Sequence, residues 1–454
     1  MALSSNTRFD ALIVGAGPAG SAAAIELARA GWSVALVEKQ RFPRRKVCGE
    51  CIAASNLPLL HQLGVGDAFE ACAGPELRQV TLWRGNQSVT AALPAADRGY
   101  GHGQWGRALG RETLDTLLLA QARSVGVEVL QPWSVQAIEG VAGAWQCELR
   151  EVEATAIRRV RAALVIDAHG SWEDLPAQRS QRRLARSASD LFAFKANFDG
   201  AALAAGAISV LTLDGGYGGM VVADGGTATL ACCVRRDRLS GLRGAAPGLS
   251  AGDAVQAWLQ RACGGVREAL HGAERDGAWL AAGPIHPGLR IGAADELFRI
   301  GNAAGEAHPI LGEGMSMALQ SARLLCAHLL SNPLGNPLGN QLGHPPVSRA
   351  PAGPQQAVLQ RRYAADWRRE FAPRMRLAAA FAQLAMRPAG ATALMALLRV
   401  WPGLLTHGAR WGGKVRLADL LCQPEAGRSS SAASAAASAA ATATTAAAAP
   451  SRAA

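Results

Sequence analysis

Residues 10–39 carry the pattern of a strand, a glycine-rich turn, a helix and a second strand. The apolar run 11–14 leads into Gly15-Ala16-Gly17-Pro18-Ala19-Gly20, small residues occupy 21–30, and a second apolar run spans 33–38. Two successive parallel strands need a crossover helix, so this stretch predicts a βαβ unit and an α/β fold. A glycine turn that opens a helix brings backbone N–H groups to an anion, which indicates a dinucleotide pyrophosphate.

The residue types in this unit suit a dinucleotide. Gly15 permits the tight turn, Gly17 lets the backbone approach the pyrophosphate, and Gly20 lets the helix lie close to the strand. Glu38, at the end of the second strand, is placed to accept hydrogen bonds from ribose hydroxyls, which favours FAD or NAD over NADP. The alternative is a turn that serves packing alone. The cofactor contacts expected here are Gly15, Gly17, Pro18, Ala19, Gly20, Glu38 and Lys39.

A second glycine string follows the apolar run 297–301. It reads Gly301-Asn302-Ala303-Ala304-Gly305, then Pro309, then Gly312-Glu313-Gly314-Met315 before an apolar helix over 316–329. Two strings so far apart suit a flavin dinucleotide held at both ends, and the helix N-terminus would stabilise the negative charge of a reduced flavin. The cofactor is therefore predicted to be FAD, with contacts at Asn302, Pro309, Gly312, Gly314 and Met315.

Further segments carry a family resemblance. Arg41-Phe42-Pro43-Arg44-Arg45-Lys46-Val47-Cys48-Gly49-Glu50 resembles the geranylgeranyl reductase-like branch of FAD-dependent oxidoreductases, within the superfamily of p-hydroxybenzoate hydroxylase (group A flavin monooxygenases) and the flavin-dependent halogenases. Residues 111–115 and 167–171 resemble its R-x-x-L-D and D-x-D/H-G segments. The resemblance implies that Arg111 helps to hold FAD and that Arg45 and Cys48 lie at the cofactor. Asn302 stands where the family has aspartate, and the absence of W-x-W-x-I-P counts against a halogenase.

Three residues are candidates for chemistry: Cys48, Tyr217 and His308. The resemblance places Cys48 near the flavin and the substrate, whereas the spacing Cys48-x-x-Cys51 also allows a redox dithiol. Tyr217 would contact substrate or pack at a sheet edge, and His308 would act as an acid or base or as a structural hydrogen-bonding group. The sequence has no His/Cys/Asp cluster with metal-ligand spacing, so no metal is expected.

Short alternating strands with glycine turns over 191–234 predict an antiparallel sheet, and a helix is expected over 251–271. The expected fold is α/β: a Rossmann-like FAD-binding domain with an inserted antiparallel β-sheet substrate domain and C-terminal helices. The expected segments are FAD-binding 1–75, 109–175 and 285–330, substrate domain 76–108 and 176–284, a flexible insertion 331–356, C-terminal helices 357–422 and a disordered tail 423–454.

Composition limits the partners. Hydrophobic residues make up 49% and charged residues 18%, and the net charge of +11 is almost wholly arginine because only four lysines occur. No basic run is interleaved with aromatic residues, so no nucleic acid is expected. Anionic cofactors, acyl carriers and peripheral membrane surfaces stay open as partners. No apolar stretch reaches the roughly 20 residues of a membrane span. The expected location is the cytoplasm, and the sequence indicates no oligomeric state.

These features predict an FAD-dependent oxidoreductase that uses electrons from transiently bound NAD(P)H. The apolar strands of the substrate domain favour a small apolar substrate of isoprenoid, lipid-like or polyketide type, which the enzyme reduces or hydroxylates. One alternative is a group A-type aromatic hydroxylase. Another is an electron-shuttling flavoprotein with a protein partner, docked on the basic residues Arg361, Arg362, Arg368 and Arg369.

Overall fold

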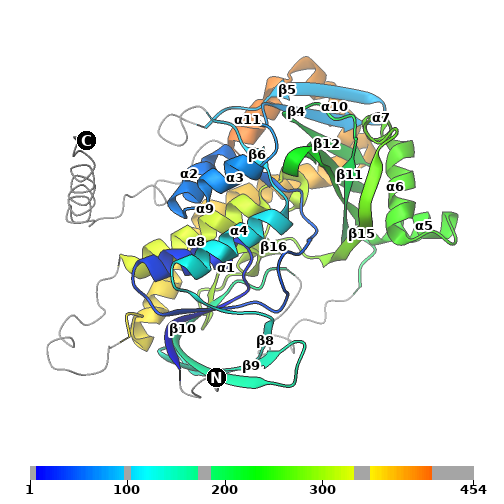
Figure 1. Ribbon diagram of the computed structural model, residues 1–454. Coiled ribbons are helices and arrows are strands. Elements are labelled where there is room, and N and C mark those ends of the chain that lie inside the picture. Colours follow the sequence, from blue (N-terminus) through cyan, green and yellow to red (C-terminus); the bar gives the residue numbers. More distant parts are fainter. Residues whose placement is uncertain (1–6, 97–103, 172–185, 332–347, 412–454) are drawn as a thin grey trace, which may run out of the picture. The chain divides into compact units, whose positions relative to one another are not determined.

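Two seven-stranded sheets organise the chain (Figure 1). The computed structural model describes residues 7–96, 104–171, 186–331 and 348–411. They belong to a unit of residues 1–417, and the second unit, 418–454, lies outside the described residues. The predicted tail 423–454 also lies outside them, as do residues 332–347 of the predicted insertion.

The first sheet is built on the predicted βαβ unit. Its central strand β1 pairs in parallel with β2 on one side and β10 on the other, and a hairpin of β8 and β9 extends the edge beyond β10. β1 and β2 are buried along nearly their whole length, as expected for strands covered on both faces. In sheet order the strands are β7 (Glu128–Leu130), β2 (Val34–Val37), β1 (Arg8–Val14), β10 (Ile157–Asp167), β9 (Ala144–Glu151) and β8 (Trp133–Val141), with β17 (Phe298–Arg299) beside β10.

Three helices lie together beside this sheet: α1 (Pro18–Arg29), α4 (Arg111–Ser124) and α8 (Gly314–Leu330) (Figure 1). Alanines dominate the buried side of α1, and their small side chains let α8 pack close. α1 begins at Pro18, three residues before the predicted start, because proline suits the first helical position. Both glycine strings thus end at the N-termini of neighbouring helices, which brings them to one place.

The second sheet is antiparallel except for one parallel pair, β12 with β4. One face packs its buried side chains, among them Phe194, Phe198 and Leu230, against Val255 and Trp258 of α6 (Ala251–Ala262). In sheet order the strands are β15 (Glu274–Ile285), β11 (Leu191–Asp199), β14 (Ala228–Arg235), β13 (Gly216–Val222), β12 (Ala207–Leu213), β4 (Gln79–Arg84) and β5 (Gln87–Ala92). The α/β fold with an FAD-type sheet and a mostly antiparallel second sheet is confirmed.

The predicted helix over 251–271 is wrong in one respect, because it is two helices. α6 (Ala251–Ala262) ends at Cys263, whose backbone is extended, and α7 (Gly264–Ala269) follows at once. The Gly264 N–H donates to the carbonyl oxygen of Gly85 at 2.9 Å, so a contact with the β4–β5 turn replaces a bond within a helix. The remaining short elements are α2 (Leu57–Gln62), α3 (Gly66–Cys72), α5 (Arg236–Ala245), β3 (Cys51–Ile52), β6 (Arg107–Ala108), β16 (Gly288–Leu289) and β18 (Gly305–Glu306).

The C-terminal helices are α9 (Gly353–Met386), α10 (Pro388–Val400) and α11 (Gly403–Trp411). The chain bends before Pro388 and again near Pro402, since a residue that precedes proline is driven towards extended backbone. α10 and α11 pack against β4 and β5 of the second sheet (Figure 1). Within the described ranges no single helix is long and apolar enough to cross a membrane, and α9 with α10 passes that test only as a pair bent by 106°.

Candidate active site

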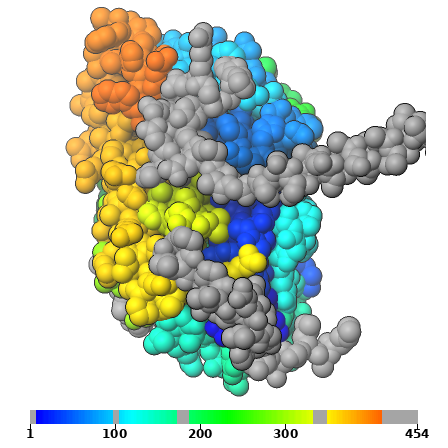
Figure 2. Space-filling view, turned by 90° about the vertical axis from the view of Figure 1, so that its left-hand side faces the viewer, coloured from blue at the N-terminus to red at the C-terminus, as the bar shows by residue number. Residues whose placement is uncertain are grey.

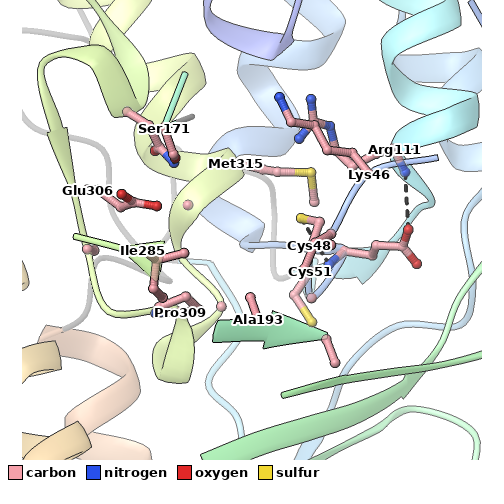
Figure 3. A pocket seen from close by; sticks show the side chains of 18 of the residues that line it. Lys46, Cys48, Cys51, Arg111, Ser171, Ala193, Ile285, Glu306, Pro309 and Met315 are labelled. Carbon is pink, nitrogen blue, oxygen red and sulfur yellow. Dashed lines mark hydrogen bonds between the residues drawn. The ribbon is translucent and has the colours of Figure 1, made fainter. Parts of the chain in front are cut away.

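One large cavity connects the two sheets and the C-terminal helices within residues 7–411. Its volume is about 960 Å³, at the upper end of the range of about 300–1,000 Å³ typical of ligand pockets. Every residue predicted to hold the cofactor lines it except Gly20, and of the three candidates for chemistry Cys48 and Tyr217 line it directly. Figure 3 shows Arg111 and Lys46 on one side, Glu306, Ile285 and Pro309 on the other, and Met315 and Cys48 between them.

In the first glycine string, Gly20 serves packing and Gly17 serves ligand binding. A Cβ on Gly20 would lie 1.9 Å from the carbonyl oxygen of Gly15, so Gly20 allows the helix to lie against the turn. A Cβ on Gly17 would meet only the Arg111 Nη2 within 4 Å, at 3.5 Å, and would otherwise point into the cavity. The structure therefore leaves space over Gly17, at the N-terminus of α1, where a pyrophosphate would lie.

Glu38 is held in place by the glycine turn itself. The backbone N–H of Ala16 donates to its Oε2 at 3.0 Å, and that of Gln40 donates to its Oε1 at 2.9 Å. The Arg44 guanidinium lies 3.7 Å from the same carboxylate. Glu38 lines the cavity at the end of β2, so the carboxylate is positioned to accept hydrogen bonds from ribose hydroxyls.

Three cations lie near the turn, and two of them are not among the predicted cofactor contacts. Arg111 makes a two-point ion pair with buried Asp115, with Nε–Oδ1 and Nη2–Oδ2 distances of 2.8 and 2.7 Å. Arg44 and Lys46 join it along the cavity wall, Arg44 at 3.2 Å from Asp115. The signal for Arg44 and Lys46 is the basic run 44–46, of which only Arg45 was predicted to touch cofactor. Arg45 lines the cavity, but its guanidinium is bound to Glu112 and Asp276.

The pKa of Lys46 is lowered to about 8 by burial and by the neighbouring charges of Arg111 and Arg44. A bound pyrophosphate would favour the protonated amine. We expect the affinity of the apoprotein for FAD to be highest below pH 8 and to fall about fivefold to tenfold as the pH rises through 8, because deprotonation removes one charge-assisted hydrogen bond. Titration of FAD by fluorescence quenching between pH 6.5 and 9.5 measures this. Lys46→Met should bind FAD more weakly, and its affinity should not change with pH over this range. If the affinity of this variant still falls as the pH rises, the pH dependence belongs to another group.

The second glycine string forms the opposite wall of the cofactor region. Asn302 donates from its Nδ2 to the Ser171 Oγ at 2.8 Å, so the amide ties this string to the turn that follows β10. Pro309 opens a short 3₁₀ turn, Gly312 takes the left-handed conformation with φ of 66°, and α8 starts at Gly314. A Cβ on Gly314 would meet no atom within 4 Å. The N-terminus of α8 therefore faces open cavity.

Cys48 lies in a loop that is fixed from inside the protein. The Glu50 N–H donates to its Sγ at 3.4 Å, and burial raises the pKa of the Cys48 thiol, which keeps the proton on the sulfur at neutral pH. Cys48 and Cys51 are not joined in a disulfide. The backbone of Glu50 has φ of 60°, and its buried carboxylate accepts hydrogen bonds from Lys195 and from the hydroxyl of Thr229.

The partner of Glu50 was missed by sequence reasoning. Lys195 is 3% exposed and lies within the otherwise apolar strand β11. A signal was present, since this is one of only four lysines in the chain and an isolated lysine in a buried strand needs an anionic partner. What the sequence did not show is that the partner comes from the Cys48 loop.

Tyr217 and His308, predicted separately, meet in the structure. The Tyr217 hydroxyl lies 3.2 Å from the His308 Nδ1, and the two rings meet edge to face. Burial lowers the pKa of His308 and raises that of Tyr217 well above its ordinary value, so both are neutral at pH 7. Beside them, Glu306 faces the cavity in a 2.6 Å ion pair with Arg290.

The far end of the cavity is apolar. β4 and β12 contribute Val80, Leu82, Ile208 and Val210, while the C-terminal helices close the opposite side. Tyr217 lies between the two ends, because its hydrophobic cluster includes buried Ile310 beside the second glycine string and packs against partly buried Phe381 of α9. The residues of the C-terminal helices that line this end are Leu377, Phe381, Leu394, Leu398, Leu404, Leu405, Gly408 and Ala409.

The residues at the polar end fit FAD. The open space over Gly17 and Gly314 lies at two helix N-termini, and three cations accompany the anionic group that such a site would hold. Among the described residues, no hydrogen-bond partner reaches the buried Nε of Arg44, as expected for a side chain that completes its contacts with a ligand. Glu38 would bind the ribose, Arg44, Lys46 and Arg111 the pyrophosphate, and the N-terminus of α8 the flavin.

Comparison with known proteins agrees with this assignment. The family described as FAD binding domain matches residues 8–336. The chain belongs to this family. As a member of the FAD binding domain family it binds FAD as its cofactor.

Curated relatives of this FAD binding domain protein match short stretches. It is 50% identical over 60 residues to a menaquinone reductase of Mycolicibacterium smegmatis, covering 13% of the chain and 15% of the relative. It is 36% identical over 140 residues to a tryptophan 2-halogenase of Chondromyces crocatus, covering 31% of the chain and 25% of the relative. The chain thus spans a quarter or less of the length of these relatives.

Solved structures share the fold over most of the chain. The myxobacterial chondrochloren halogenase CndH superposes with a TM-score of 0.67 at 19% identity, covering 92% of this chain and 95% of that one. PqsL of Pseudomonas aeruginosa, described as a probable FAD-dependent monooxygenase, superposes with a TM-score of 0.61 at 18% identity, covering 84% and 96%. At these identities the likeness establishes the fold.

Proposed function

We propose that this protein is an FAD-dependent oxidoreductase that hydroxylates a bulky apolar substrate carrying a hydroxyl group, with electrons from NAD(P)H. The observation that carries the proposal is the cavity itself, in which a polar cofactor end and an apolar end meet at the Tyr217–His308 pair. When bound, FAD supplies the redox chemistry, either towards O₂ or towards a substrate double bond. The proposal also includes the predicted segment boundaries, the roles of the predicted site residues and a cytoplasmic location.

The Tyr217–His308 pair is suited to hold a substrate hydroxyl and to take its proton. A neutral imidazole whose Nδ1 accepts from the Tyr217 hydroxyl leaves the phenol oxygen able to accept a second hydrogen bond from the cavity. A substrate hydroxyl bound there can pass its proton to Tyr217 while Tyr217 passes its own to His308. Such a transfer would make the substrate richer in electrons, which favours hydroxylation.

The other parts of the site position the cofactor and the substrate or exclude water. Cys48, protonated and fixed by the Glu50 loop, forms part of the cavity wall beside Met315. The positive end of the α8 dipole would stabilise negative charge on the cofactor. The apolar end would exclude water from the reacting groups and accept the body of the substrate.

Reduction of a substrate double bond is the second candidate, favoured by the resemblance of the 41–50 segment to geranylgeranyl reductase-like enzymes and by the short match to a menaquinone reductase. Halogenation is a third reaction known among its fold relatives, although the W-x-W-x-I-P motif is absent from the sequence. An electron shuttle is less favoured, because a large apolar cavity serves no purpose in a protein that only passes electrons.

One mass-spectrometric experiment separates these reactions. Purified holoenzyme is incubated with a lipid-rich extract, NADH or NADPH, air and bromide, and the metabolites are compared with an enzyme-free sample. Hydroxylation consumes O₂, one NAD(P)H and one proton, adds one oxygen atom to the substrate and releases water. We expect this product. Gain of two hydrogens without O₂ uptake, or of one bromine, would replace the proposal by reduction or halogenation.

Tyr217→Phe tests the proton pair in the same assay. We expect the variant to retain FAD and to lose about 100-fold in kcat, within the range for removal of an acid–base group, because the ring stays in place while the proton path is cut. His308→Gln should match it and also alter the pH profile of kcat. Normal turnover in both variants would show that Tyr217 and His308 serve packing and not proton transfer.

A further inference from the structure

The C-terminal parts of α10 and α11 expose large apolar side chains. Leu397, Val400, Trp401 and Trp411 have exposed fractions of 51%, 87%, 59% and 79%, and Val400 and Trp411 are the most exposed large hydrophobic residues of the described chain. Figure 2 shows these helices, in orange, projecting at one end of the face in view. Clustered exposed apolar side chains usually mark a surface that binds a partner or a membrane.

The charge of the same region has one sign. Residues 371–411 contain five arginines and no aspartate or glutamate. Arg374 is bound to Glu370, whereas Arg387, Arg399 and Arg410 are exposed. The strands packed against these helices add Arg84 and no acidic residue. A partner that covers this surface would therefore be both apolar and anionic.

The inner side of the same two helices forms the apolar wall of the cavity. Leu394 and Leu398 of α10, with Leu404 and Leu405 of α11, line it. These helices therefore carry one set of apolar side chains that line the cavity and a second set that is exposed. Burial in the protein explains the first set of side chains, but nothing in the described structure covers the second.

We propose that the exposed surface of α10 and α11, with Leu397, Val400, Trp401, Trp411 and the exposed arginines, docks on the surface of an anionic lipid membrane. Tryptophan suits the boundary between headgroups and acyl chains, where its ring is buried and its N–H stays hydrated. Arginines extend to lipid phosphates, and each basic residue near an anionic surface strengthens binding about fivefold. The cavity wall then lies one helix away from the membrane, which gives a lipid-like substrate a short route.

A protein with an acidic surface, such as an acyl carrier, is the other class of partner with matching charge. Such a protein would form ion pairs with the arginines, but these would not explain why Val400 and Trp411 are exposed. The lipid surface accounts for the charge and the apolar side chains together.

Vesicle flotation tests the docking surface without any turnover, so its failure leaves the proposed reaction untouched. Full-length holoenzyme is floated with phosphatidylcholine vesicles containing about one third phosphatidylglycerol, and with phosphatidylcholine alone. We expect binding to the anionic vesicles that weakens with salt. Trp401→Ser with Trp411→Ser should reduce it at least about tenfold, as should Arg399→Glu with Arg410→Glu.

Matched variants control for loss of apolar area and of charge elsewhere. Val141→Ser with Ile157→Ser removes two exposed apolar side chains from the first sheet, and Arg243→Glu with Arg261→Glu reverses two exposed charges on α5 and α6. Both controls should float as the parent protein does. The proposal fails if the parent protein does not bind anionic vesicles, or if the controls lose binding as much as the α10–α11 variants. It also fails if Arg399→Glu with Arg410→Glu still binds anionic vesicles as the parent protein does and loses only the binding of an acidic acyl carrier protein.

Discussion

Replacing Gly17 with valine gives a folded protein that no longer retains FAD. Only the tip of Arg111 lies within 4 Å of the position of the new Cβ, so the fold tolerates the side chain. The same side chain occupies the space where the pyrophosphate would approach the N-terminus of α1. Loss of two charge-assisted hydrogen bonds lowers the affinity at least about 100-fold. Absorbance near the flavin band after purification, with circular dichroism to check folding, measures both effects.

Gly20→Ala is the control that separates binding from folding. Its Cβ would lie 1.9 Å from the Gly15 carbonyl oxygen, so the backbone must shift, and overpacking of this kind destabilises by about 1–3 kcal/mol or more. We expect Gly20→Ala to lower the melting temperature of the apoprotein, whereas Gly17→Val leaves it near that of the parent apoprotein. A yellow Gly17→Val protein would refute the placement of the cofactor.

Replacing Lys195 with methionine destabilises the protein more than any surface change. The Glu50 carboxylate is 1% exposed, and without Lys195 it loses the cation that faces it. Breaking a buried pair by removing one partner costs about 3–5 kcal/mol in the free energy of unfolding. Because Glu50 belongs to the Cys48 loop, we also expect weaker FAD binding. Urea titration monitored by circular dichroism measures the first effect.

Two further variants show whether the unpaired charge is the cause. Lys195→Met with Glu50→Gln removes both charges and should recover much of the lost stability, since the amide can still bond to Thr229. Arg159→Met breaks an exposed ion pair with Glu148 and should cost at most about 1 kcal/mol. If Lys195→Met costs no more than Arg159→Met, the buried pair contributes little.

Much of the cofactor end was predictable because its signals are local. Gly15, Gly17 and Gly20 act within one turn, and Glu38 follows at the end of the next strand, so spacing along the chain determines their positions. Gly312 and Gly314 likewise occupy the start of one helix. Short-range periodicity also predicted the antiparallel strands over 191–234. In contrast, the single helix expected over 251–271 breaks at Cys263, because a tertiary contact with Gly85 competes with helical bonds.

The amino-acid sequence by itself determined the βαβ unit, the two glycine strings and therefore FAD. Only the tertiary structure decided which distant side chains meet: Lys195 with Glu50 across 145 residues, and Tyr217 with His308 across 91. It also decided that α10 and α11 line the apolar end of the cavity with some of their apolar side chains and expose others, Val400 and Trp411 among them. The physical reason is that backbone periodicity and turn chemistry act over a few residues, whereas ion pairs, proton pairs and cavity walls depend on which surfaces the whole fold buries together.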